Sequence, residues 1–239
     1  MMKRTLLYNI VSILFCLLLF SCSKQPDYQY GEKVWVHRAN EMDKARALQY
    51  QYAGLEIDIF YDAEQKCFMI KHDVNEEPLL SLNQWLDSLE NRSQIGLWLD
   101  LKNLTPENKA DIVKALLRVR DQYKLKGKIL VESMSYDCLK DIEKQGFDIS
   151  YYIPPFNPDE EDSLLVGQMN DSIAKVTSQY HIPTISGYYY QYEFMKANFP
   201  SLHKLLWYHP YDEALRNHYV EIAQNDPMVD VLLVGVAEW

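Results

Sequence analysis

The sequence predicts an α/β fold, a (β/α)8 TIM barrel built by a single domain. Three observations lead to this prediction. From residue 33 onwards, short apolar runs alternate with longer segments of helical periodicity. Eight such runs occur, and each except the last is followed by a helical segment. No internal repeat and no signal for a second domain interrupts the pattern. Regular alternation is typical of a parallel sheet, and eight strands favour a closed barrel over an open sheet.

The expected strands span 33–37, 54–60, 96–102, 128–133, 148–153, 182–187, 203–208 and 229–236. The expected helices span 40–52, 81–91, 106–123, 135–145, 159–180, 189–198 and 211–224. Thr105 before Pro106 is a favourable helix start, because proline at the first helical position needs no backbone donor. Gly127 and Gly146 fall where the preceding helices are expected to end.

Composition limits the class of function. The chain has 239 residues and 48% apolar content, enough for one large core. Its formal net charge of −10 argues against a nucleic-acid-binding surface. A small anionic substrate remains compatible, because a bound metal ion reverses the local sign of charge. Cys67 and Cys138 are too few for a disulfide framework, so we expect ordinary thiols, with a single bridge as the alternative.

The N-terminus has the features of a secretory signal. Lys3 and Arg4 precede an almost wholly apolar stretch, 6–20, which ends in Leu-Phe-Ser-Cys at Cys22. This ending resembles the lipobox of bacterial lipoproteins. We therefore expect a signal peptide at 1–21, lipidation of Cys22, a linker at 22–32 and the barrel at 33–239. The protein would be lipid-anchored in a bacterial cell envelope, at the outer membrane or the periplasmic face. An uncleaved membrane anchor is the alternative.

Acidic residues that point to the same face of the sheet lie within the apolar strands. Glu56 and Asp58 point to the same side of their strand, because side chains alternate along a strand. Asp100 has the corresponding position in the next barrel strand. Three carboxylates without Cys or His favour Mg²⁺ or Ca²⁺ over zinc. The alternative is a structural ion-pair cluster with Lys102 and Arg38, although buried ion pairs stabilise proteins poorly.

Two histidines, His37 and His72, end apolar runs beside these acids. A pair of imidazoles at one site can supply a base or nucleophile and a general acid. Asp73 or a backbone carbonyl would orient an imidazole. The remaining candidates are expected to bind substrate: Lys102 and Arg38 at anionic oxygens, Glu132 by holding one of these two cations, and Trp207 with the run Tyr188–Tyr190 as an apolar wall. For the aromatic residues, ordinary packing is the alternative.

These motifs occur in a familiar order: His37-Arg38, Glu56-x-Asp58, His72-Asp73 and Asp100-x-Lys102. In this order they resemble the glycerophosphodiester phosphodiesterase-like superfamily of TIM barrels. Three features depart from the usual pattern. Ala39 replaces a glycine, the Pro-Glu-Asn-Thr segment is missing, and Asp100 stands in place of glutamate. With these departures the chain is also similar to the sphingomyelinase D-type phospholipases and to the Menorin family.

The resemblance implies a metal-dependent phosphoric diester hydrolase with two-histidine catalysis. Its substrate would be a small glycerophosphodiester, or a (lyso)phospholipid through its head group. One alternative is a non-catalytic surface lipoprotein that binds glycans or lipid head groups on a degenerate barrel. Another is a barrel glycosidase. It is disfavoured because Glu56 and Asp58 are too close together to flank a sugar.

Overall fold

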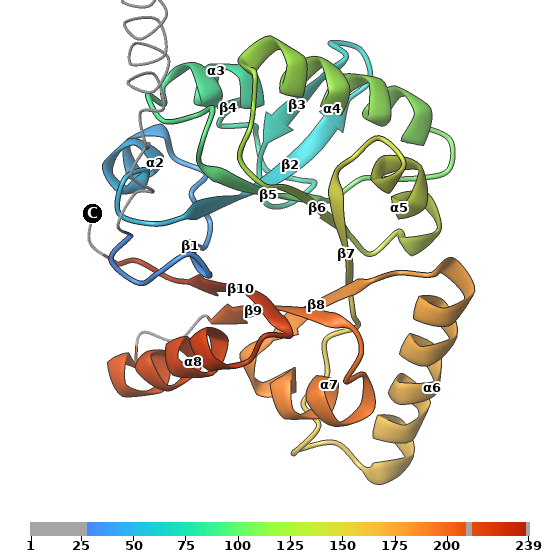
Figure 1. Ribbon diagram of the computed structural model, residues 1–239. Helices are drawn as coiled ribbons and strands as arrows, with labels where there is room; N and C mark the ends of the chain where they lie inside the picture. The colour runs from blue at the N-terminus through green and yellow to red at the C-terminus, as the bar shows by residue number, and fades with distance from the viewer. Residues whose placement is uncertain (1–27, 209–211, 238–239) are drawn as a thin grey trace, which may run out of the picture.

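A computed structural model of the protein describes residues 28–208 and 212–237, and eight parallel strands form its core (Figure 1). The predicted signal, the lipobox with Cys22 and the first part of the linker lie outside the described residues. The barrel strands are β1 (Val34–Val36), β2 (Gly54–Asp62), β5 (Gly96–Leu101), β6 (Ile129–Ser133), β7 (Asp148–Tyr152), β8 (Thr184–Tyr188), β9 (His203–Tyr208) and β10 (Val229–Val234). Strand β1 pairs with both β10 and β2, which closes the barrel. The predicted (β/α)8 fold is confirmed.

Helices surround the barrel, and Figure 1 shows them outside the strands. They are α2 (Met42–Leu48), α3 (Leu82–Asp87), α4 (Lys109–Tyr123), α5 (Tyr136–Glu143), α6 (Ser163–Tyr180), the short 3₁₀ helix η1 (Tyr189–Gln191), α7 (Tyr192–Asn198) and α8 (Glu213–Asn225). Within the described residues, no helix has both the length and the apolar character needed to cross a membrane.

The start of α4 differs from the prediction, whereas its last residue, Tyr123, is the one predicted. The helix begins at Lys109 and not at Pro106, because Thr105 and Asn108 hold each other in a turn first. The Thr105 amide donates to Asn108 Oδ1 at 2.8 Å, and the Asn108 amide donates to Thr105 Oγ1 at 3.3 Å. At the other end Lys124, and not Gly127, adopts the left-handed conformation that ends the helix, with φ of 50°.

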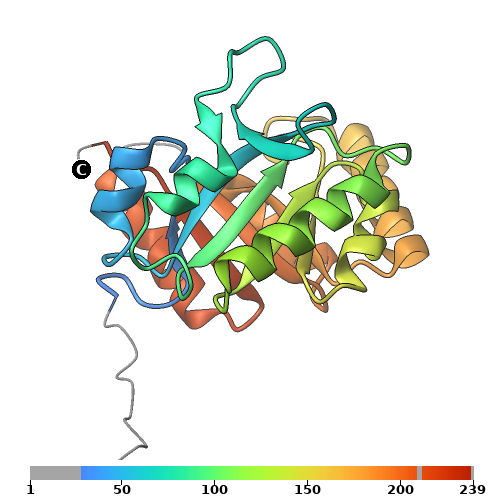
Figure 2. The ribbon, with the colours of Figure 1, turned by 90° about the horizontal axis from the view of Figure 1, so that it is seen from above.

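A hairpin extends β2 beyond the barrel. Residues Ile59–Asp62 pair in antiparallel fashion with β3 (Cys67–Ile70), which pairs in turn with β4 (Leu80–Ser81). Asp62 Oδ1 accepts the backbone N–H groups of the next turn at 2.9 Å, which favours the tight reversal. The loop between β3 and β4, which carries His72, projects from the barrel (Figure 2).

Side-chain parity follows the prediction. Trp35 and Trp98 pack inside the barrel, whereas Val34, Val36 and Leu99 join the layer between strands and helices. Trp35 fills the amino-terminal end of the barrel. It lies against Gly54 and Gly96, where an added Cβ would come within 2.1 and 2.5 Å of its ring atoms. Trp35 thus closes the barrel interior at the amino-terminal ends of the strands. A polar pocket can form only at their carboxyl ends.

The two cysteines of the domain are free thiols. Cys67 is half-buried in β3 and Cys138 is buried in α5. The expectation of ordinary thiols is confirmed, and the alternative of a bridge between them is wrong.

Candidate active site

A pocket of about 270 Å³ lies at the carboxyl ends of the barrel strands. Its walls contain nine of the residues that the sequence singled out: His37, Arg38, Glu56, Asp58, His72, Asp100, Lys102, Glu132 and Trp207. Four further residues complete the lining: Trp98, Tyr152, Tyr188 and Leu233. A larger and more open groove of about 520 Å³ lies between α7 and α8. It contains none of the predicted site residues, so the chemistry is expected in the smaller pocket.

Three carboxylates meet at one point of this pocket. Glu56 and Asp58 come from β2, and Asp100 lies in register with Asp58 on β5. One oxygen of each residue lies within 4.8 Å of the others. Asn40 forms two hydrogen bonds with Asp58. Its amide donates to Asp58 Oδ2 at 2.8 Å, and its Oδ1 accepts the Asp58 backbone N–H at 3.0 Å.

Lys102 supplies positive charge to this group. Its ammonium lies 2.8 Å from Asp58 Oδ1 and also forms an ion pair with Asp100. Burial alone would lower the pKa of Lys102, but the charges of Asp100 and Asp58 outweigh it, and the pKa rises. Lys102 therefore stays charged.

One ammonium does not balance three carboxylates. Burial raises the pKa of Glu56 well above its usual value, and the charges of Asp58 and Asp100 raise it further. Burial also raises the pKa of Asp100, although Lys102 opposes this. With all three acids ionised, the group carries a net charge of about −2. The oxygen donors and the surplus charge both fit a hard divalent cation.

His37 lies at the end of β1 beside Glu56. Its backbone N–H donates to Val234 O at 2.9 Å, and its Nε2 lies 3.8 Å from Glu56 Oε2. Arg38 follows in a left-handed conformation with φ of 50°, and its backbone N–H donates to Glu56 Oε2 at 2.6 Å. The Lys44 ammonium, on α2, donates to the carbonyls of both residues at 3.0 Å. The sequence did not point to Lys44, because its contacts are with backbone atoms.

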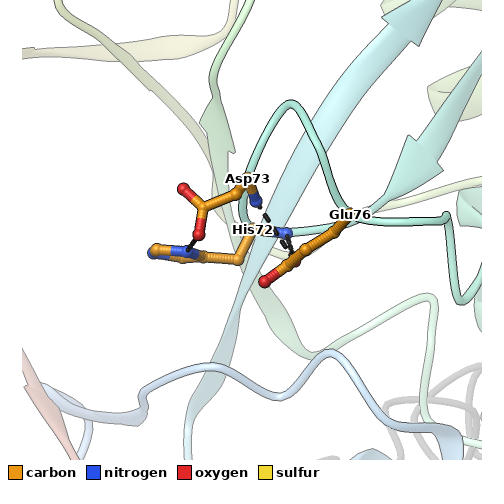
Figure 3. A group of neighbouring side chains, drawn as sticks. All are labelled: His72, Asp73 and Glu76. Carbon is orange, nitrogen blue, oxygen red and sulfur yellow. Dashed lines mark hydrogen bonds and ion pairs between the residues drawn. The ribbon is translucent and has the colours of Figure 1, made fainter.

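His72 is oriented by its own loop (Figure 3). Glu76 Oε2 accepts the backbone N–H groups of His72 and Asp73 at 3.0 and 3.2 Å. The Asp73 carboxylate lies 3.1 Å from His72 Nδ1, and the Arg38 guanidinium donates to Nε2 at 2.7 Å. These partners favour the tautomer with the proton on Nδ1, in which the Nε2 lone pair accepts the Arg38 hydrogen bond. His72, Asp73 and Glu76 could together hold an ion, but Asp73 and Glu76 are exposed on the loop and His72 is only half-buried.

Glu132 does not have the partner that the sequence predicted. It is 1% exposed and lies in register with Asp100, one strand further round the barrel. Among the ion pairs of the described residues, none joins Glu132 to Lys102 or to Arg38. Lys102 is already engaged by Asp58 and Asp100, and Arg38 is engaged by His72. Burial and the charge of Asp100 raise the pKa of Glu132 well above its usual value.

Aromatic side chains form one wall. Trp207 contacts Tyr152 and Tyr188, with ring centroids 4.3 and 4.9 Å apart. Tyr188 lines the pocket, whereas Tyr189 packs away from it against Tyr208. Tyr152 was missed by sequence reasoning. Its position at the end of β7 was the available signal, since residues at this end of a barrel strand face the site.

Comparisons with known proteins add a fold likeness. No family model matches the chain, and no curated protein matches it. A glycerophosphodiester phosphodiesterase from Parabacteroides distasonis is 17% identical, with a TM-score of 0.56 over 84% of this chain and 91% of that one. An Oleispira antarctica phosphodiesterase, solved with the product sn-glycerol-3-phosphate, is 14% identical, with a TM-score of 0.58 over 85% and 92%. A glycerophosphodiester phosphodiesterase from Thermotoga maritima is 12% identical, with a TM-score of 0.56 over 85% and 94%. At these identities, the likeness shows that the chain shares their barrel fold.

Proposed function

We propose that this protein is a metal-dependent phosphoric diester hydrolase acting on small glycerophosphodiesters or on the head groups of (lyso)phospholipids. One observation carries the proposal: three carboxylates meet beside a single ammonium, which pairs with only two of them, in a pocket that two imidazoles also line. The fold likeness to several glycerophosphodiester phosphodiesterases supports it, as does the product bound by the Oleispira enzyme.

Glu56, Asp58 and Asp100 would hold the metal, Mg²⁺ or Ca²⁺. When bound, such an ion supplies Lewis-acid polarisation of a phosphoryl oxygen and neutralises developing charge. Asn40 restricts the orientation of Asp58, because it bonds to both its carboxylate and its backbone N–H. The Arg38 backbone N–H restricts the Glu56 carboxylate through one hydrogen bond to Oε2. These contacts preorganise the ligands, which lowers the cost of assembling the site.

Lys102 and Arg38 would bind the non-bridging phosphoryl oxygens. The Lys102 ammonium faces the pocket from between Asp58 and Asp100, and the Arg38 side chain is exposed at the pocket mouth. When a phosphoryl group enters, the Arg38 guanidinium can exchange its bond to His72 for one to the substrate. The exchange would free the Nε2 atom of His72 at the moment the substrate is in place.

His37 and His72 would move the protons. With its proton on Nδ1 held by Asp73, His72 can accept a proton at Nε2 from water or from a substrate hydroxyl. His37, beside the Glu56 carboxylate, is suited to carry a proton that it donates to the leaving alkoxide. The non-catalytic alternative is not favoured, because binding alone does not require two imidazoles beside buried acids.

The test is a panel of glycerophosphodiesters and lysophospholipids followed by ³¹P NMR, with and without a chelator. We expect hydrolysis that is lost on chelation and restored by Mg²⁺ or Ca²⁺. Product analysis for cyclic phosphate distinguishes attack by water from attack by a substrate hydroxyl. If no phosphodiester in the panel is cleaved by metal-loaded protein, the proposal is wrong.

Lipid anchoring through Cys22 in a bacterial cell envelope belongs to the same proposal. Its support is the sequence of the lipobox, Leu-Phe-Ser-Cys, after an apolar stretch. Anchoring would place the enzyme outside the cytoplasm, where phosphodiesters released from lipids and envelope polymers are available.

A further inference from the structure

The backbone turn that follows β1 has a conformation that its central residue disfavours. Arg38 has φ of 50°, in the left-handed region that glycine adopts readily and residues with a Cβ adopt rarely. In an extended strand, the carbonyls of consecutive residues point to opposite sides. Here the carbonyls of His37 and Arg38 both accept hydrogen bonds from one ammonium, that of Lys44, at 3.0 Å. Such a conformation persists only where surrounding contacts hold it.

Other contacts hold the turn on both sides of Arg38. The backbone N–H of His37 is bound to β10. The Ala39 backbone N–H donates to Glu56 O at 2.8 Å, and the Ala39 carbonyl accepts the Trp85 indole N–H at 2.9 Å. The carbonyls of the left-handed step itself are bound by a side chain of α2, the next element of the chain.

This turn sets the positions of several groups of the active site. The Arg38 backbone N–H donates to Glu56 Oε2 at 2.6 Å, and His37 Nε2 lies 3.8 Å from the same oxygen. The Arg38 guanidinium donates to His72 Nε2 at 2.7 Å. A change of backbone conformation at Arg38 would disturb these contacts together, because they start from two consecutive residues. Lys44 itself is not one of the described residues that line the pocket, so it can influence the contacts through the turn.

We propose that Lys44 is a positioning residue, whose ammonium stabilises the left-handed turn at Arg38 and thereby holds Glu56 and His37 in place. Its effect on catalysis rests on the proposed function, whereas its effect on the turn does not. An ammonium suits this role, because it can donate three hydrogen bonds and a charged donor forms stronger bonds than a neutral one. A through-space attraction between Lys44 and Glu56 is the competing explanation.

The first experiment follows the turn without any substrate. In ¹H–¹⁵N spectra of the protein without added metal, the Arg38 amide proton should resonate far downfield, because it donates to a carboxylate at 2.6 Å. Lys44→Met should move this signal upfield, and Lys44→Arg should largely preserve it. Lys44→Gln, with a shorter neutral donor, should give an intermediate signal and replaces the methionine variant if that variant does not fold. Lys175→Met, at an exposed lysine of α6, should change nothing.

The second experiment changes the residue at the turn and measures cleavage of a substrate from the panel. Glycine adopts the left-handed conformation without strain, so it should not need the ammonium. Lys44→Met should lower kcat roughly tenfold in an Arg38→Ala background, with little change in KM. In an Arg38→Gly background, which also lacks the guanidinium, the same substitution should cost less than about threefold.

Two results would overturn the positioning role. One is an Arg38 amide signal that is the same in Lys44→Met and Lys44→Gln as in wild type. The other is an equal loss of kcat in the alanine and glycine backgrounds, which a through-space effect of charge predicts. If wild-type protein cleaves no diester while the Arg38 signal responds as expected, the proposed function fails and the role of Lys44 in the turn stands.

Discussion

The Lys102 ammonium lies 2.8 Å from Asp58 Oδ1, inside a group of three carboxylates that are close enough to share a metal ion. A metal ion held by these carboxylates would therefore lie next to the lysine in one acidic site. Both sequence interpretations of these residues, the metal site and the ion-pair cluster, describe part of this arrangement. The charge balance favours the metal site, because with all three acids ionised one ammonium leaves a surplus of about two negative charges.

Removing the ammonium should destabilise the protein. Lys102→Ala leaves Asp58 and Asp100 buried without a cation, and breaking such a pair costs about 3 kcal/mol. Urea denaturation of the metal-free protein measures this loss. Lys114→Ala is the matched control, since its ion pair with Asp111 is exposed and should be worth less than about 1 kcal/mol. Equal stability of the two variants would contradict the role given to Lys102.

A divalent cation should stabilise the protein in a pH-dependent way. Because the folded-state pKa values of Glu56 and Asp100 are raised, the folded protein binds more protons than the unfolded chain between the ordinary and the raised values. Metal-free stability should therefore fall as pH rises through this window. At neutral pH, Mg²⁺ or Ca²⁺ at 100 times its Kd should add about 2.7 kcal/mol.

Calorimetry with and without metal at several pH values measures both effects. The metal-induced rise in Tm should shrink as the pH falls, because protons compete for the same oxygens. Asp100→Asn should abolish this rise, whereas Asp43→Asn, at an exposed acid, should preserve it. A rise of equal size in wild type and Asp100→Asn would show that the ion binds elsewhere.

Asp73 is expected to act through His72. His72→Ala should lower kcat about 10²–10⁴-fold, since it removes a proton-transfer group. Asp73→Asn keeps the imidazole but changes the partner of Nδ1, so it should lower kcat by roughly tenfold and shift the acid limb of the pH–rate profile. Asp171→Asn, at an exposed helix position, serves as the control. An unchanged pH profile in Asp73→Asn would rule out this positioning role.

Two glycines should respond in opposite directions to alanine. At Gly54, the new Cβ would lie 2.1 Å from the Trp35 ring, so overpacking should cost about 1–3 kcal/mol or more. Combining Gly54→Ala with Trp35→Leu should recover part of the loss. At Gly167, in α6, nothing lies within 4 Å, and alanine should stabilise the helix by about 0.5–1 kcal/mol. If Gly54→Ala is tolerated as well as Gly167→Ala, Trp35 does not pack against Gly54 at the amino-terminal end of the barrel.

Lipidation of Cys22 can be tested by mass spectrometry of protein from the envelope fraction of a bacterial host. Wild-type protein should begin at Cys22 and carry fatty acids, and it should partition into detergent. Cys22→Ser should remain unlipidated, while Cys67→Ser should behave as wild type, since Cys67 lies within the barrel domain. An unmodified Cys22 in the wild type would contradict the anchor.

Strand parity explains why so much of the site could be predicted. A residue such as Asp100 or Glu56, charged and late in an apolar strand, can only face the barrel interior near its open end. Register then brings Asp58 and Asp100 side by side. His72 was predicted because it ends an apolar run that follows the acids. The hairpin that continues β2, which the predicted strands did not include, is what brings the chain back to the pocket.

Other features depend on distances that a sequence does not contain. Glu132 was expected to hold a cation, but Lys102 and Arg38 are already paired on neighbouring elements. The start of α4 depends on a reciprocal contact between Thr105 and Asn108, which competes with the helix start at Pro106. Tyr152 ends its strand, which places it near the site, but its partner cannot be read from the sequence. Only the closure of the barrel brings it against Trp207.

The most direct test of the account is anomalous diffraction from crystals grown with Mn²⁺, an oxygen-preferring ion that can replace Mg²⁺. The account predicts one strong anomalous peak coordinated by Glu56, Asp58 and Asp100, with the Lys102 ammonium beside it. The same data from an Asp100→Asn crystal should lack the peak. A wild-type crystal with no peak at these carboxylates, and Lys102 still bridging Asp58 and Asp100, would contradict a metal-dependent active site.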